Sequence, residues 1–183
     1  MDLFEEYLEK KDNENVKRAL TAESYKNRDH SLKNKNVAPD LATLGDAIIK
    51  LCYTKYFLDK VEQLSKEVEK YVTDERFVTV IAKHYDLLKY INYDDIDKNI
   101  LRDYDYKIPG KTSSGKNKKT SPHKYIATAV EAMIGAIYLE TQKTQTETKA
   151  LDKISELLLQ WKEFIDKNTQ WVNNLIYWVF VIL

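Results

Sequence analysis

Two apolar runs of this chain have helical spacing, and each contains a glycine close to an acidic residue. The first pair is Gly45 and Asp46, and the second is Glu131 and Gly135, one turn apart. A glycine inside a helix costs roughly 1 kcal/mol relative to alanine, so it is typical of places where another backbone comes close. Two tightly packed helices that each offer one carboxylate would form a divalent-metal site.

Apolar residues recur at spacings of three and four along most of the chain, which predicts an all-α fold. The clearest run covers residues 40–58 and begins after Pro39, a helix-start signal. A second helix is expected from Ser121 to about Glu140, and Thr146 is placed to cap a last long one. Shorter helices are expected at residues 3–8, 16–25, 61–72 and 73–88, and within 92–105.

The length of the chain indicates one domain, and its net charge excludes a general electrostatic attraction to nucleic acid or membrane. The chain has 183 residues, with 29 lysines and arginines against 29 aspartates and glutamates, so any such attraction must be local. The acidic, amphipathic N-terminus has no signal-peptide pattern, and the single cysteine, Cys52, lies in an apolar run. We therefore expect a cytoplasmic protein with a buried, reduced cysteine.

The C-terminal segment is the most hydrophobic part of the chain. We divide the sequence into a main domain, residues 1–168, and an apolar tail, residues 169–183, whose last nine residues are all apolar. A spanning helix needs about 20 apolar residues, so this run is too short to cross a membrane. Packing on the core or a contact with a second subunit is the favoured interpretation, and membrane association is the alternative.

The segment 107–124 is basic and contains no acidic residue. It has two glycines and ends in an expected helix start, which is typical of a mobile loop. Such a loop suits RNA, because A-form RNA is bound mainly through its phosphates and 2′-hydroxyls. A solvated linker is the alternative. The candidate RNA-binding residues are Lys111, Lys116, Lys118, Lys119 and Lys124.

Each of the two carboxylates also has an ordinary structural explanation. Asp46 has Lys50 one turn away, so it could form an i,i+4 ion pair, and Glu131 could lie at a solvated edge. A carboxylate on a largely buried helix must otherwise be paired, hydrogen-bonded or bound to a metal. The residues alone leave these alternatives open.

Four blocks of the sequence resemble, in order and spacing, the ribonuclease III catalytic domain, and the resemblance covers roughly residues 1–165. The blocks are 19–25 (ALTAESY), 41–49 (LATLGDAII), 71–83 (YVTDERFVTVIAK) and 127–139 (ATAVEAMIGAIYL). The resemblance implies an all-helical homodimer that cuts double-stranded or structured RNA with Mg²⁺, for which Mn²⁺ can substitute, leaving short 3′ overhangs. A ribosomal RNA precursor is one substrate of this kind.

The resemblance assigns the family's catalytic, metal-binding aspartate and glutamate to Asp46 and Glu131. Three further acidic positions of the family are Pro39, Ala42 and Thr128 in this chain. The residues at 42 and 128 resemble the pattern of the Mini-ribonuclease III branch, which lacks the RNA-binding domain. No such domain is expected after the last helix here. The alternative function is a catalytically inactive RNA-binding or scaffold protein.

Overall fold

The computed structural model describes residues 1–22, 39–92, 106 and 122–182, with side chains for 1–22, 39–92, 106 and 123–169. Within these ranges the chain is helical and contains no named strand, only an isolated parallel bridge between Thr21 and Asn92. The predicted all-α class is confirmed. The residues expected to form the basic loop, apart from those from 122 onward, lie outside this described part, as does most of 92–105.

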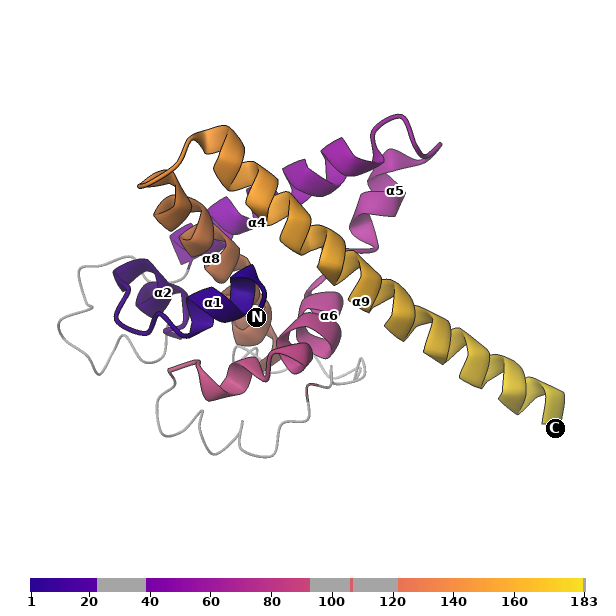
Figure 1. Ribbon diagram of the computed structural model, residues 1–183. Helices are drawn as coiled ribbons and strands as arrows, with labels where there is room; N and C mark the ends of the chain where they lie inside the picture. Colours follow the sequence, from indigo (N-terminus) through magenta and orange to yellow (C-terminus); the bar gives the residue numbers. More distant parts are fainter. Residues whose placement is uncertain (23–38, 93–105, 107–121, 183) are drawn as a thin grey trace, which may run out of the picture.

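Helices α4 (Pro39–Phe57) and α8 (Pro122–Gln142) form the centre of the fold and begin at the predicted prolines (Figure 1). Their backbones touch at the two glycines. A Cβ atom added to Gly45 would lie 1.8 Å from the carbonyl oxygen of Glu131, and one added to Gly135 would lie 2.2 Å from that of Leu41. Both contacts are too short for any side chain, which confirms the predicted close approach of these helices.

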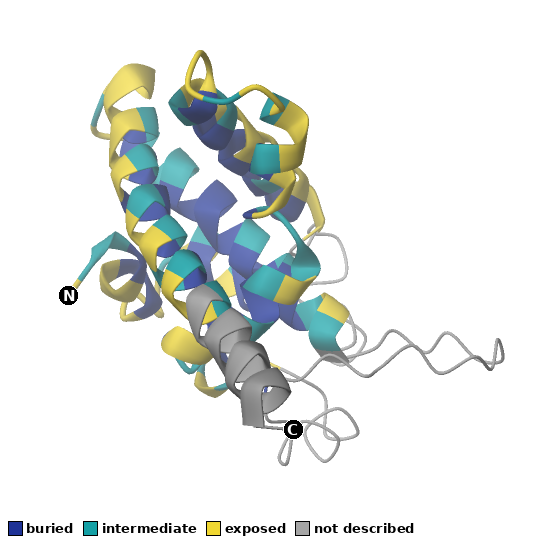
Figure 2. Cartoon of the chain, turned by 90° about the vertical axis from the view of Figure 1, so that its right-hand side faces the viewer, coloured by how far each residue is buried: buried dark blue, intermediate teal, exposed yellow. Residues whose placement is uncertain are grey.

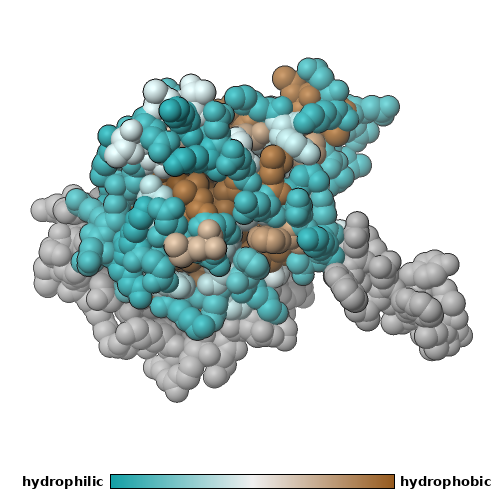
Figure 3. Space-filling model, viewed as in Figure 1, coloured by the Kyte–Doolittle hydropathy of each residue, from teal (hydrophilic) through white to brown (hydrophobic). Residues whose placement is uncertain are grey.

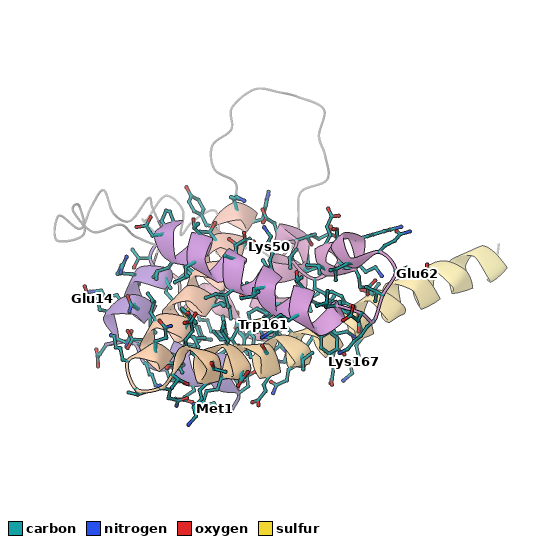
Figure 4. The ribbon with its side chains drawn as sticks, turned by 90° about the horizontal axis from the view of Figure 1, so that it is seen from above. Met1, Glu14, Lys50, Glu62, Trp161 and Lys167 are labelled. Carbon is teal, nitrogen blue, oxygen red and sulfur yellow. The ribbon has the colours of Figure 1, made fainter. Side chains whose placement is uncertain are left out.

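Helix α9 (Glu147–Ile182) crosses the other helices, and its C-terminal part extends beyond them (Figure 1). Thr146 caps it, because the Thr146 hydroxyl accepts a hydrogen bond from the Lys149 N–H at 3.4 Å. The fully buried Trp161, labelled in Figure 4, anchors α9. Its ring N–H donates a hydrogen bond to the Tyr85 hydroxyl at 3.0 Å. The backbone of residues 169–182 continues α9, so the apolar tail is helical, and its role in packing or subunit contact stays a prediction.

The N-terminal segment folds as α1 (Leu3–Leu8), which has an Asp2–Glu5 capping box, and α2 (Glu14–Ala19). Within the described residues α2 is shorter than the helix predicted for 16–25. After Ala19 the chain forms the bridge to Asn92, whose N–H donates to the Leu20 carbonyl at 2.7 Å. This long-range pairing replaces the helical hydrogen bonds that the local spacing predicts.

The segment between the end of α4 and residue 92 forms short helices. They are α5 (Leu64–Glu69), α6 (Asp74–Arg76), the π-helix η2 (Phe77–Ala82) and the 3₁₀ helix η3 (Leu87–Lys89). The single helix predicted for 73–88 is helical from Asp74 to His84, but η2 interrupts its α-helical geometry and a turn at 85–86 separates it from η3. Four β-branched residues in a row, 78–81, disfavour a regular α-helix. Asp86 then ends the helical path with a left-handed φ of 48°.

The core lies where α1, α4, α8, α9 and η2 meet, and most of α8 is buried (Figure 2). Cys52 is buried and free, as predicted. The face seen in Figure 3 is largely hydrophilic, with apolar side chains in small patches. No helix in the described part of the chain is long and apolar enough to cross a membrane.

Candidate functional site

A cavity of about 540 Å³ opens between α4, α8 and the start of α6. Helix α4 contributes Asp46 to its wall, α8 contributes Glu131, and α6 contributes Asp74. Two lysines also line the cavity, Lys50 from α4 and Lys124 from the first turn of α8. Acidic and basic side chains thus face one space, which has room for a hydrated cation and part of a substrate.

Asp46 and Glu131 lie on the two helices that touch at Gly45 and Gly135. The backbone of Glu131 would contact any side chain at position 45, so the helix turns that contain Asp46 and Glu131 lie next to each other. Both carboxylates are partly buried and line the same cavity, so the structure brings together the pair that the sequence selects.

Glu131 is unusually hard to ionise. Burial, the charge of Asp46 and the charge of Asp74, in decreasing order, raise the pKa of Glu131 to about 7, while Lys124 and Lys50 oppose this rise. Buried acids with raised pKa values are typical of functional sites, although ion-pair networks also produce them. The shift indicates that the three carboxylates interact electrostatically across the cavity.

The two lysines each neutralise one carboxylate. Lys50, on the side of α4 away from α9 (Figure 4), forms an ion pair with Asp46 at 2.7 Å. This is the i,i+4 pair that the sequence offers, and it coexists with the position of Asp46 on the cavity wall. Lys124 forms an ion pair with Asp74 at 3.1 Å. The other four candidate RNA-binding residues, Lys111, Lys116, Lys118 and Lys119, lie outside the described residues.

The three positions where acidic residues are missing face the same cavity. Pro39, Ala42 and Thr128 all line it, so the space beside Asp46 and Glu131 is bounded by apolar and hydroxyl groups. Among the described side chains, no group of three or more histidines, cysteines, aspartates and glutamates could hold a metal ion directly. Two carboxylates still suit Mg²⁺, which binds hard oxygen ligands and keeps several waters.

Asp74 is the site residue that sequence reasoning missed. It lies in the block that resembles the family's middle helix, and Thr73 caps its helix by accepting a hydrogen bond from the Arg76 N–H at 3.3 Å. An acidic residue in the first turn of a helix is ordinary, so the local sequence contains no signal for a role in the site. Only the packing of α6 beside α8 reveals its position.

Comparisons with known proteins agree with this fold. The family model for the ribonuclease III domain matches residues 40–142. The Mini-ribonuclease 3-like protein of Fusobacterium nucleatum is 35% identical over 126 residues, which cover 63% of this chain and 84% of that protein. Ribonuclease 3 of Clostridium perfringens is 29% identical over 154 residues, covering 81% of this chain and 53% of that protein. The chain thus spans about half the length of the latter relative.

Two solved structures of the nuclease domain of ribonuclease III from Campylobacter jejuni have the same fold. One superposes with a TM-score of 0.59 at 23% identity, covering 86% of this chain and 95% of that one. The other superposes with a TM-score of 0.58 at 24% identity, covering 91% of this chain and 93% of that one. At these identities the similarity supports the fold.

Proposed function

Because the chain belongs to the ribonuclease III family, we propose that it is a magnesium-dependent endoribonuclease that cleaves double-stranded or structured RNA. A ribosomal RNA precursor is a substrate of this class. The observation that supports the proposal most is the convergence of Asp46 and Glu131 on one cavity, across a contact that only glycine allows.

In this proposal Asp46 and Glu131 hold the cation, and the cavity admits one phosphodiester of the RNA. Bound Mg²⁺ supplies activation of the attacking water and stabilisation of the leaving oxygen. Lys50 neutralises Asp46 when no cation is bound, and the partial burial of Glu131 keeps bulk water away from one side of the site. Lys124 lines the same cavity and would offer a positive charge to the reacting phosphate.

We also propose that the protein acts as a homodimer. The nuclease domain of ribonuclease III from Campylobacter jejuni has a region involved in dimer formation. In this chain Leu51 and Leu58, two turns apart on α4 and just after it, are 46% and 53% exposed and offer apolar surface to a second copy. Sedimentation equilibrium is expected to give twice the chain mass of 21.5 kDa, and a mass of one chain at micromolar concentration would contradict the dimer.

The nuclease proposal is tested with two isosteric variants. Asp46→Asn and Glu131→Gln are each expected to abolish Mg²⁺-dependent cleavage of a duplex RNA, because each removes one of two anionic ligands. Circular dichroism verifies that the variants stay folded, and Asp40→Asn, an exposed change on α4 away from the cavity, is the control. Wild-type cleavage by either site variant excludes the proposed roles.

The second candidate function is a catalytically inactive RNA-binding or scaffold protein. The residues Pro39, Ala42 and Thr128, which stand at acidic positions of the family, favour it. Purified protein that retards a duplex RNA in a gel but never cuts it, with Mg²⁺ or Mn²⁺, would support this candidate against the enzyme.

A further inference from the structure

Asp74 lies on the same cavity as the two proposed metal ligands but belongs to a different part of the chain. Its carboxylate is 38% exposed and forms an ion pair with Lys124 at 3.1 Å. Thr73 caps α6, so the carboxylate of Asp74 is not needed for that purpose. The neighbouring Glu75 is exposed and does not line the cavity, so the two acids differ in position although they are adjacent in sequence.

We propose that Asp74 is a third acidic residue of the divalent-cation site, contributed by α6 where positions 42 and 128 lack acidic side chains. This inference rests on the proposed function. The side chains of Ala42 and Thr128 line the cavity without adding charge, so Asp74 is the third carboxylate on its described wall. A third negative charge would raise the attraction of the site for a divalent cation.

Asp74 acts through water and is a positioning residue. Direct coordination by three side chains is not supported, because no group of three such ligands exists among the described residues. Mg²⁺ and Mn²⁺ retain several waters in sites of this kind, and carboxylates that accept hydrogen bonds from those waters change the affinity by about 10- to 100-fold. The ion pair with Lys124 partly cancels the charge of Asp74 when the cation is absent.

The test is a titration of the metal-free full-length chain with Mn²⁺ alone, in which electron paramagnetic resonance measures the free ion. Asp74→Asn is expected to weaken binding about tenfold, at the lower end of effects seen for such outer residues. Asp74→Glu, which restores the charge, is expected to recover most of the affinity. Glu75→Gln, the matched control one residue away, is expected to leave it unchanged.

Lys124→Gln is expected to change the Mn²⁺ affinity in the opposite direction. Removing a partly exposed counter-charge is expected to tighten Mn²⁺ binding roughly threefold, within the range measured for surface ion pairs. A purely structural role of the Asp74–Lys124 pair predicts instead that Asp74→Asn and Lys124→Gln both lose stability. It does not predict that one variant weakens Mn²⁺ binding while the other tightens it. Thermal unfolding of each variant measures that loss separately.

The two proposals fail in different ways. If Asp46→Asn abolishes Mn²⁺ binding while Asp74→Asn binds like Glu75→Gln, the role of Asp74 is excluded and the metal site stands. If wild-type protein binds no Mn²⁺, or if Asp46→Asn binds Mn²⁺ as well as wild type does, the proposed metal site is excluded. The role of Asp74 is then excluded as well.

Discussion

Glu131 is placed where its charge is costly for the folded chain. Its side chain is partly buried in the cavity wall where α8 meets α4, and the negative charges of Asp46 and Asp74 act on it across the cavity. A side chain that only stabilised the fold would be neutral at this position. Retention of an acid in such surroundings is typical of residues that sacrifice stability for function.

The raised pKa of Glu131 predicts how stability changes with pH in protein kept free of metal by EDTA. The folded-state pKa of about 7 lies above the ordinary value of 4.5, so the folded state holds the proton more tightly than the unfolded state. The resulting stabilisation is fully present below pH 4.5 and is lost as the pH rises through 7. Glu131→Gln should therefore match wild type in melting temperature near pH 4.5 and exceed it at pH 8.

The control for this experiment is Glu156→Gln, which removes an exposed carboxylate on α9. Thermal unfolding of both variants and wild type is followed by circular dichroism at several pH values. A difference between Glu131→Gln and wild type that does not grow with pH would show that Glu131 ionises normally in the fold.

At the scale of helices, the α4–α8 contact decides both the packing and the site. The two helices approach so closely that the glycines replace the side chains that normally separate helices by about 8–10 Å. The same contact aligns Asp46 with the turn of α8 that contains Glu131. Packing and chemistry therefore depend on the same two glycines.

Gly45→Ala and Gly135→Ala test this contact. In an ordinary helix such a change stabilises by about 1 kcal/mol, because alanine has the higher helix propensity. Here the added methyl group would meet a backbone carbonyl oxygen at 1.8 Å or 2.2 Å, so the helices must separate. Each variant is expected to lose about 3 kcal/mol or more in urea denaturation, the upper part of the range for overpacking. Stabilisation by either change would mean that the helices lie farther apart.

Strongly periodic helices could be predicted from the sequence, and the short ones could not. Helices α4, α8 and α9 begin where Pro39, Pro122 and Thr146 indicate, because their periodicity and start signals are local. The end of α2 and the π-helix η2 depend on pairing with Asn92 and on a β-branched run packed in the core, so local spacing misleads there.

The candidate site also contains residues that could be predicted from the sequence and one that could not. The nearby helical glycines point to Asp46 and Glu131, and the resemblance of the surrounding blocks to the ribonuclease III catalytic domain selects them. Asp74 reaches the cavity only through the packing of α6 against α8, and no local pattern encodes that contact. The structure likewise shows that Lys124, selected for RNA, is paired with Asp74.

For the whole molecule, the equal numbers of acidic and basic residues give the protein no general attraction for RNA. Within the cavity the two lysines are already paired with carboxylates. Affinity for a polyanion must therefore come from a local excess of positive charge. The sequence contains such an excess at residues 107–124, which end in the first turn of α8, where Lys124 lines the site.

Replacing four lysines of this segment by glutamine should therefore weaken duplex RNA binding and reduce its salt dependence. The changed residues are Lys111, Lys116, Lys118 and Lys119. Each phosphate that the protein no longer neutralises reduces the steepness of log K against log salt by roughly 0.9, so binding isotherms at several KCl concentrations measure how many phosphates this segment binds. The matched control removes four exposed lysines that do not line the cavity, Lys66, Lys149, Lys153 and Lys167. Both variants carry the same net charge, so an equal loss of affinity in the two would show that total charge, and not this segment, binds the RNA.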